Sequence, residues 1–253
     1  MQNKTHAVMS QRWEGKESLD NFPTPPWATR ALIEHVMGSA HALSNMSCLE
    51  PACGAGHMAK VLHEYFGQVV ASDIHQYGYG DLADFIRAPY EVRSFDWVIT
   101  NPPFRLAEEF ILKSLNLARC GVAILTRTVF LESVGRYDRL FKASPPSKFA
   151  QFAERVPMVK GRLDKSASTA TGYCWLVWEK QRRAAPKLVW IPACRRVLER
   201  EGDYDVPNAT SHKVARLIKV PQLKVAQPKK VSQKHTDLFS FDGVSLYSSD
   251  EPC

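Results

Sequence analysis

Short apolar runs alternate with helix-like stretches along most of this chain, and that alternation constrains the fold more than any other feature. The apolar runs are Met46–Ala52, Val69–Ile74, Phe95–Thr100 and Val122–Phe130. Longer stretches typical of helices lie between them, at Met58–Phe66 and Leu106–Ala118. Strands that alternate with helices predict an α/β fold with a mostly parallel sheet covered by helices on both faces.

Two later apolar runs, Phe149–Val156 and Tyr173–Glu179, have no helical pattern between them. We therefore expect them to pair as an antiparallel hairpin at one edge of the sheet. The segment that joins them is small, polar and basic, as an exposed loop would be. A further apolar patch at Leu188–Ile191 is expected to pack on the body of the protein.

The 253 residues suffice for one main domain with short extensions. We predict a flexible arm at residues 1–19, a main domain at residues 20–192 and a basic, flexible tail at residues 193–253. The formal net charge is +7, and residues 206–234 hold seven Lys and Arg and no acidic residue. A basic tail beside a nearly neutral body favours a polyanionic partner such as nucleic acid.

The sequence also argues against several classes of protein. Its first twenty residues are polar, and it has no apolar run long enough to cross a membrane, so we expect a cytoplasmic protein without a membrane partner. The cysteines lack the spacing of a zinc site, and no metal is expected. Nothing in the sequence indicates an oligomeric state.

The first motif that carries chemistry is Leu49–Met58 (LEPACGAGHM), in which an apolar strand runs into a glycine-containing turn before a helix. Gly54 and Gly56 would let the backbone approach a ligand closely. Glu50 at the strand end suits a ligand with an ammonium group better than a pyrophosphate. The motif therefore hints at a ligand with an amino-acid moiety, although a dinucleotide-binding turn has a similar pattern.

The second motif is Thr100–Phe104 (TNPPF), directly after the apolar strand that ends at Ile99. An aromatic amine is a poor nucleophile because its lone pair is delocalised into the ring. The side-chain oxygen of Asn101 and the carbonyl of Pro102 could accept its two N–H groups and direct the lone pair toward a methyl donor. Pro103 stiffens the backbone, and Phe104 offers a flat face to a base that has left its stack.

With these two motifs in this order, residues 20–180 resemble the class I, Rossmann-like methyltransferases that use S-adenosylmethionine, specifically adenine-N6 DNA methyltransferases with an NPPF motif of the phage and prophage orphan type. The resemblance implies a seven-stranded, mostly parallel sheet and makes residues 20–192 the methyltransferase domain. If the enzyme is phage-encoded, its location is the host cytoplasm. No large target-recognition domain follows the core, so we expect low or short sequence specificity.

The resemblance also implies roles for individual residues. Thr24 would contact the methionine carboxylate, and Asp73 would accept from the ribose hydroxyls. Asp84 would receive the adenine amino group of the cofactor. The catalytic residues it implies are Asn101, Pro102, Pro103 and Phe104, and the cofactor-binding residues are Thr24, Glu50, Cys53, Gly54, Gly56, Asp73, Ile74, Asp84 and Phe85.

Several alternatives stay open on the sequence alone. The substrate nitrogen could belong to adenine in DNA, to adenine in RNA, or to a glutamine side chain of a protein. A nonenzymatic nucleic-acid or partner-binding module is a fourth reading. Arg127, Glu132 and Arg136 follow a strand end, where they could line the substrate side of the pocket or form an ion pair on a helical turn.

Overall fold

The computed structural model describes residues 20–38, 40–180 and 185–205. The predicted arm at residues 1–19 and the part of the predicted tail at residues 206–253 lie outside the described residues. The strands are β1 (Ser47–Glu50), β2 (Gln68–Asp73), β3 (Asp81–Leu82), β4 (Phe95–Thr100), β5 (Ala118–Arg127), β6 (Lys148–Phe152), β7 (Tyr173–Glu179) and β8 (Lys187–Ile191).

The helices are mostly short, and α4 is the longest of them. They are α1 (Pro26–Leu32), α2 (Ala40–Leu43), α3 (His57–Leu62), α4 (Ala107–Leu117), α5 (Val134–Arg136) and α6 (Arg195–Leu198). Short π and 3-10 turns, η1 (Ile33–Met37), η2 (Thr128–Leu131) and η3 (Tyr137–Phe141), adjoin α1 and α5. In the described part of the chain, no helix is long and apolar enough to cross a membrane.

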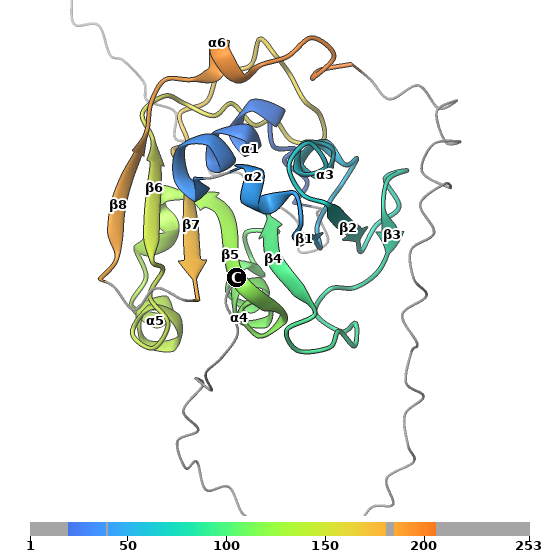
Figure 1. Ribbon diagram of the computed structural model, residues 1–253. Helices are drawn as coiled ribbons and strands as arrows, with labels where there is room; N and C mark the ends of the chain where they lie inside the picture. The colour runs from blue at the N-terminus through green and yellow to red at the C-terminus, as the bar shows by residue number, and fades with distance from the viewer. Residues whose placement is uncertain (1–19, 39, 181–184, 206–253) are drawn as a thin grey trace, which may run out of the picture.

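The eight strands of the described residues form one sheet in the order β3-β2-β1-β4-β5-β7-β6-β8 (Figure 1). Only β7 runs against the others, because it pairs antiparallel with both β5 and β6 while the remaining pairs are parallel. The chain moves outward from β1 to β3 and then returns to the other side of β1 with β4. The carboxyl ends of β1 and β4 therefore flank the point where the strand order reverses, which is where open α/β sheets bind ligands.

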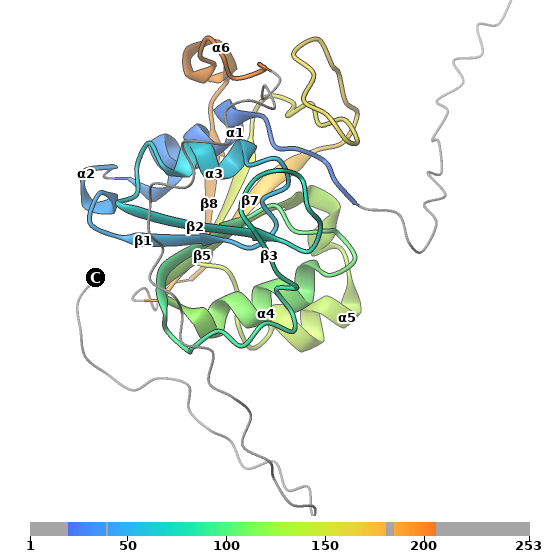
Figure 2. The same cartoon turned by 90° about the vertical axis from the view of Figure 1, so that its right-hand side faces the viewer.

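Helices cover both faces of this sheet. Figure 2 shows α1, α2 and α3 above the sheet and α4 and α5 below it. The predicted α/β class with a mostly parallel sheet and helices on both faces is confirmed.

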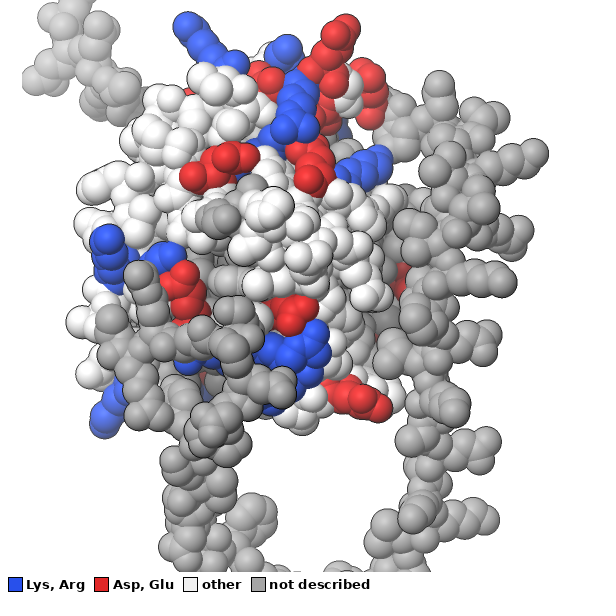
Figure 3. Space-filling view, viewed as in Figure 1, with Lys and Arg blue, Asp and Glu red and all other residues white. Residues whose placement is uncertain are grey.

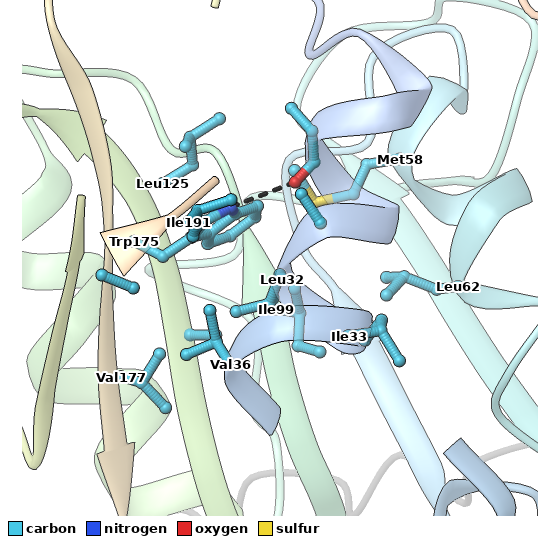
Figure 4. Close-up of a cluster of buried hydrophobic side chains, with 14 of the residues drawn as sticks. Leu32, Ile33, Val36, Met58, Leu62, Ile99, Leu125, Trp175, Val177 and Ile191 are labelled. Carbon is cyan, nitrogen blue, oxygen red and sulfur yellow. Dashed lines mark hydrogen bonds between the residues drawn. The ribbon is translucent and has the colours of Figure 1, made fainter. Parts of the chain in front are cut away.

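The apolar strands supply two cores at once because successive side chains point to opposite faces. In β4, Ile99 packs with the α1 side and Val98 with the α4 side. In β7, Trp175 and Leu176 divide in the same way. Trp175 is fully buried and donates from Nε1 to the carbonyl of Ala28 at 3.2 Å (Figure 4). A strand that is buried on both faces therefore has a continuous run of apolar residues in its sequence.

The sheet has one strand more than the seven that the resemblance implies. The apolar patch at Leu188–Ile191 belongs to β8, which pairs with β6 at the edge, with Trp190 63% exposed and Ile191 buried. The predicted antiparallel hairpin is present as β6 and β7. It does not form the sheet edge, however, because β7 inserts between β5 and β6, and β8 lies outside β6.

The first residues of the predicted tail pack on the body. The guanidinium of Arg30 on α1 is 3% exposed and lies between the carboxylates of Glu64 and Asp203, at 2.7 and 2.8 Å. Removing one partner of a buried pair costs about 3 to 5 kcal/mol because it leaves a charge uncompensated. Residues after 192, where the main domain was predicted to end, therefore also pack on the body, Asp203 among them.

Candidate active site

A cavity of about 450 Å³ opens at the carboxyl ends of β1, β2 and β4, at the point where the strand order reverses. The segment before α1, residues 20–24, forms one wall. The residues that line it are Asp20, Asn21, Phe22, Pro23, Thr24, Glu50, Pro51, Ala52, Cys53, Gly54, Ala55, His57, Met58, Asp73, Ile74, Tyr77, Asp84, Phe85, Ile86, Asn101, Pro103, Arg105, Leu106 and Phe110.

The turn after β1 is held by the strand beside it. Asp73, at the end of β2, accepts the backbone N–H of Gly54 at 2.9 Å through one carboxylate oxygen. Its other oxygen accepts the N–H of His75 at 2.9 Å. Each carboxylate oxygen has two lone pairs, so Asp73 can still accept hydrogen bonds from a ligand in the cavity. Gly54 has a φ of +52°, in the left-handed region that favours glycine.

Gly56 has a different reason to be glycine. Its φ is +81°, and a Cβ built on it would lie 2.3 Å from the ring of Tyr79. Gly56 does not line the cavity. Its missing side chain makes room for Tyr79 and permits the turn into α3, and the close approach to a ligand predicted for both glycines is available in this cavity only at Gly54.

Glu50 brings a buried carboxylate to the cavity. The side chain is 2% exposed, and its Oε2 has no hydrogen-bond partner among the described residues. Burial raises the pKa of Glu50 well above its usual value, and the nearby Asp73 adds to the shift. A buried acceptor without a donor is costly, so this oxygen suits a ligand that supplies a cationic donor.

The residues after β2 and β3 form the far end of the cavity. Ile74 is 62% exposed beside it, whereas the ring of Phe85 is buried in the α4-side core with one part facing the cavity. Asp84 Oδ1 accepts the backbone N–H of Ile86 at 3.0 Å, and Oδ2 lies 3.5 Å from Arg87 Nε. An apolar surface next to a carboxylate suits a planar, amino-bearing ring.

Asn101 is oriented by a segment nearly eighty residues away. Its Nδ2 donates to the carbonyl of Phe22 at 2.9 Å and to Thr24 Oγ1 at 3.1 Å, and lies 3.8 Å from Met158 Sδ. A carbonyl only accepts, so the atom facing Phe22 must be the amide nitrogen. Both amide hydrogens then have acceptors, and Oδ1 remains available to accept a hydrogen bond at the cavity.

Phe104 lies beside the cavity but does not line it. Its backbone N–H donates to Asp20 Oδ2 at 2.6 Å. The ring is 6.0 Å from that of Phe22 and 6.4 Å from that of Tyr173, between centroids. The guanidinium carbon of Arg127 lies over it, 4.0 Å from its centroid. The flat face that was predicted to receive a base is thus covered by Arg127.

The structure brings most of the predicted site residues to one cavity. The exceptions are Gly56, Pro102 and Phe104, which adjoin the lining without belonging to it. The residues that do line it come from five separate stretches of the chain, and they are Thr24, Glu50, Cys53, Gly54, Asp73, Ile74, Asp84, Phe85, Asn101 and Pro103.

Sequence reasoning missed several lining residues. Asp20 and Asn21 stand beside the proline-rich segment, but nothing in their own pattern marks them as polar groups of a site. Tyr77 also lines the cavity and forms an edge-on contact with His75, with centroids 4.8 Å apart. A position four residues after a strand-end carboxylate is the only signal that singles out Tyr77.

His57 and Cys53 are two lining groups other than carboxylates whose pKa values are shifted. Burial lowers the pKa of His57 to about 4, with a smaller contribution from the charge of Lys60. Burial also raises the pKa of the Cys53 thiol. Both groups are therefore neutral near pH 7, and they add no charge to this part of the cavity.

Arg127, Glu132 and Arg136 were expected either to line the substrate side of the pocket or to form an ion pair on a helical turn. Arg136 donates from Nε to the carbonyl of Phe130 at 2.7 Å, and its guanidinium lies 4.4 Å from the centroid of the Phe130 ring. No ion pair between Arg136 and Glu132 is present in the described residues. Among Arg127, Glu132 and Arg136, it is Arg127 that contacts the predicted catalytic motif, through the ring of Phe104.

Comparisons with known proteins agree with this architecture. A structure from Vibrio vulnificus YJ016, provisionally assigned as the modification subunit of a type I restriction enzyme, aligns with a TM-score of 0.50 and 15% identity over 74% of this chain and 50% of that chain. A structure from Pyrococcus horikoshii, provisionally assigned as an RNA methyltransferase, aligns with a TM-score of 0.50 and 13% identity over 66% and 91%.

These likenesses establish the fold, which is the Rossmann-like fold of class I methyltransferases. The chain spans half the length of the Vibrio subunit. No protein-family model and no curated protein matches the sequence.

Proposed function

We propose that this protein transfers a methyl group from S-adenosylmethionine to an exocyclic amino nitrogen, and that its substrate is adenine N6 in DNA. The observation that carries the proposal is the orientation of Asn101. With both amide hydrogens directed at Phe22 and Thr24, Oδ1 is the atom that can accept an N–H of the incoming amine. An oxygen fixed in advance helps because it costs no reorganisation when the nitrogen begins to react.

The cavity fits the proposed cofactor. The orphaned Oε2 of buried Glu50 suits the ammonium of a methionine moiety, and Asp73 retains lone pairs for ribose hydroxyls. Ile74 and Phe85 offer apolar surface near Asp84, as an adenine ring with its amino group requires. When bound, S-adenosylmethionine supplies a methyl group already activated by its positively charged sulfur.

The protein's own residues then have a limited task. Asn101 Oδ1, together with the carbonyl of Pro102 as predicted, would hold the amino group with its lone pair toward the methyl donor. As the nitrogen gains the methyl group it becomes positively charged, and these oxygens stabilise that charge until one proton leaves to water. No strong base is required, and the histidine in the lining, His57, is a weak base because burial lowers its pKa to about 4.

DNA is the proposed substrate because of the chain's charge distribution and because Phe104, the aromatic residue of the motif, offers a flat face to a base. The sequence carries a net charge of +7, with most of the surplus beyond residue 180. On the face in Figure 3, cationic and anionic side chains of the described body are mixed, and both signs gather over α6. A nearly balanced body with a basic tail fits a backbone-binding enzyme that recognises little sequence.

The same site chemistry would serve adenine in RNA, and the likeness to the Pyrococcus protein makes RNA the second candidate. A glutamine side chain is the third. An amide nitrogen presents the same delocalised lone pair, but a basic tail suits a protein substrate less.

One experiment separates these substrates. Labelled methyl transfer from S-adenosylmethionine is measured in parallel on double-stranded DNA, single-stranded DNA, structured RNA and protein, and the products are digested and identified by mass. We expect N6-methyldeoxyadenosine. Methylated RNA or protein would change the substrate but keep the chemistry, and the absence of transfer to all four would contradict the proposal.

A further inference from the structure

Arg127 covers the residue that a target base would need. It is the last residue of β5, and its guanidinium carbon lies 4.0 Å from the centroid of the Phe104 ring. Guanidinium planes stack on aromatic faces much as nucleobases do. The position over Phe104 is therefore occupied by a group that a planar base could replace.

The other neighbours of Phe104 cannot make way for a base. Phe22 and Tyr173 are each 4% exposed and belong to the α1-side core. Asp20 holds the backbone N–H of Phe104 at 2.6 Å. Arg127, by contrast, is a long side chain at the end of a strand and is only half-buried. Access to the ring thus depends on Arg127.

In this position, Arg127 also lacks a hydrogen-bond acceptor for its Nε–H group among the described residues. Its Nε is buried without a hydrogen-bond partner, and its guanidinium forms no ion pair with any residue in the described ranges 20–38, 40–180 and 185–205. A buried donor without an acceptor favours any rearrangement that supplies one. The contact with the ring is therefore one that a competing ligand can displace.

We propose that Arg127 occupies the target-base site of the free protein and leaves the face of Phe104 when the base enters. The proposal rests on the proposed function, because it takes Phe104 as the surface that receives the base. It places the ring of the base beside the present cavity, with its amino group directed to Asn101, because Asn101 and Pro103 line the cavity and Phe104 does not. The binding of a base and the arginine stack are then mutually exclusive.

The first test is the ring-current shift of the Arg127 Nε–H signal in an NMR spectrum of the free, nitrogen-15-labelled protein. The signal is identified by its loss in Arg127→Lys. It should lie at high field because the group sits over an aromatic ring, and Phe104→Leu should return it to the ordinary range. An ordinary position in the unaltered protein would refute the stack, whatever the protein's activity.

The second test adds S-adenosylhomocysteine and a single-stranded deoxyoligonucleotide with one adenine. This oligonucleotide should return the signal to the ordinary range, and the same oligonucleotide with an abasic site in place of the adenine should not. If the unaltered protein methylates the adenine while the signal stays at high field, the base binds elsewhere and the proposal is wrong. A protein that methylates no adenine would fail earlier, at the proposed function.

The third test compares Arg127→Met with Arg136→Met. Arg136 is the matched control because it also stacks on a phenylalanine, Phe130, and carries the same charge. Arg127→Met should raise the affinity for the adenine oligonucleotide relative to the abasic one about threefold to tenfold, the range expected for loss of one competing cation–π contact. Arg136→Met should leave that ratio unchanged. Equal losses of affinity for both oligonucleotides in both variants would show only phosphate attraction and would overturn the proposal.

Discussion

The two sides of the cavity differ in how their groups are held. On the β1–β2 side, Asp73 and Gly54 are nineteen positions apart and are joined by one hydrogen bond between neighbouring strand ends. On the β4 side, Asn101 and Phe104 are held by residues 77 to 84 positions away, in the segment before α1. Arg127 also covers Phe104 on this second side, although Asn101 lines the cavity directly.

From this difference we infer that the two sides of the cavity have separate roles. The proposed cofactor side is formed by adjacent strands, and we expect it to change little when a ligand enters. The proposed substrate side depends on long-range contacts and on Arg127, which we propose is displaced. Variants that affect one side should therefore leave the other side intact, and four of them test this separation.

Asn101→Ala should have the largest effect. Removal of Oδ1 takes away the fixed acceptor for the amino group, and methyl transfer should fall at least about a hundredfold. Cofactor affinity should stay within about twofold, because the cofactor-binding residues proposed here lie elsewhere in the cavity. Transfer rates and calorimetric titration with S-adenosylmethionine give the two values. A fall in cofactor affinity as large as the fall in transfer rate would show that Asn101 also supports cofactor binding, so that the two sides are not separate.

Asp73→Ala should have the converse effect. It removes the acceptor of the Gly54 N–H and the proposed acceptor of the ribose hydroxyls, so the dissociation constant for S-adenosylmethionine should rise about tenfold to a hundredfold. At saturating cofactor the transfer rate should largely recover. A rate that stays low at saturation would show that Asp73 also acts on the substrate side.

Glu50 should make cofactor affinity depend on pH. Its ionised form is the one that binds an ammonium, and burial raises its pKa well above the usual value. Affinity should therefore be highest above that raised pKa and fall as pH decreases, beginning at a higher pH than for an exposed glutamate. Titrations across this range check it. Glu50→Gln should bind more weakly and lose this dependence, and a persistent dependence would assign it to another group.

Thr24→Val should have the smallest effect on methyl transfer. It tests whether Thr24 acts on the cofactor side or on the substrate side of the cavity. The resemblance implies contact with the methionine carboxylate, whereas the structure gives its hydroxyl to Asn101 Nδ2. With Asn101 less firmly oriented, the transfer rate should fall about threefold to tenfold at saturating cofactor. Thr24→Ser, which keeps the hydroxyl, is the control. A change confined to cofactor affinity would favour the role implied by the resemblance.

Much of the architecture was predictable from local patterns. The runs that became β1, β4 and β5 are apolar because these parallel strands are buried on both faces, whereas β2 is only partly buried. Strand-end positions of Glu50, Asp73 and Asn101 followed from those runs, since parallel strands end at a common edge. The edge strand β8 was not predicted because Leu188 and Trp190 are more than half exposed, and an exposed edge strand has no distinct burial pattern.

The sequence alone determined the α/β class, the two motifs and the order in which they reach the sheet edge, because each depends on residues close together in the chain. Only the tertiary structure decided that residues 20–24 orient Asn101, that Gly56 makes room for Tyr79 and that Arg127 covers Phe104. These contacts join segments far apart in the sequence. Their distances are set by the packing of the whole sheet, and no local pattern encodes them.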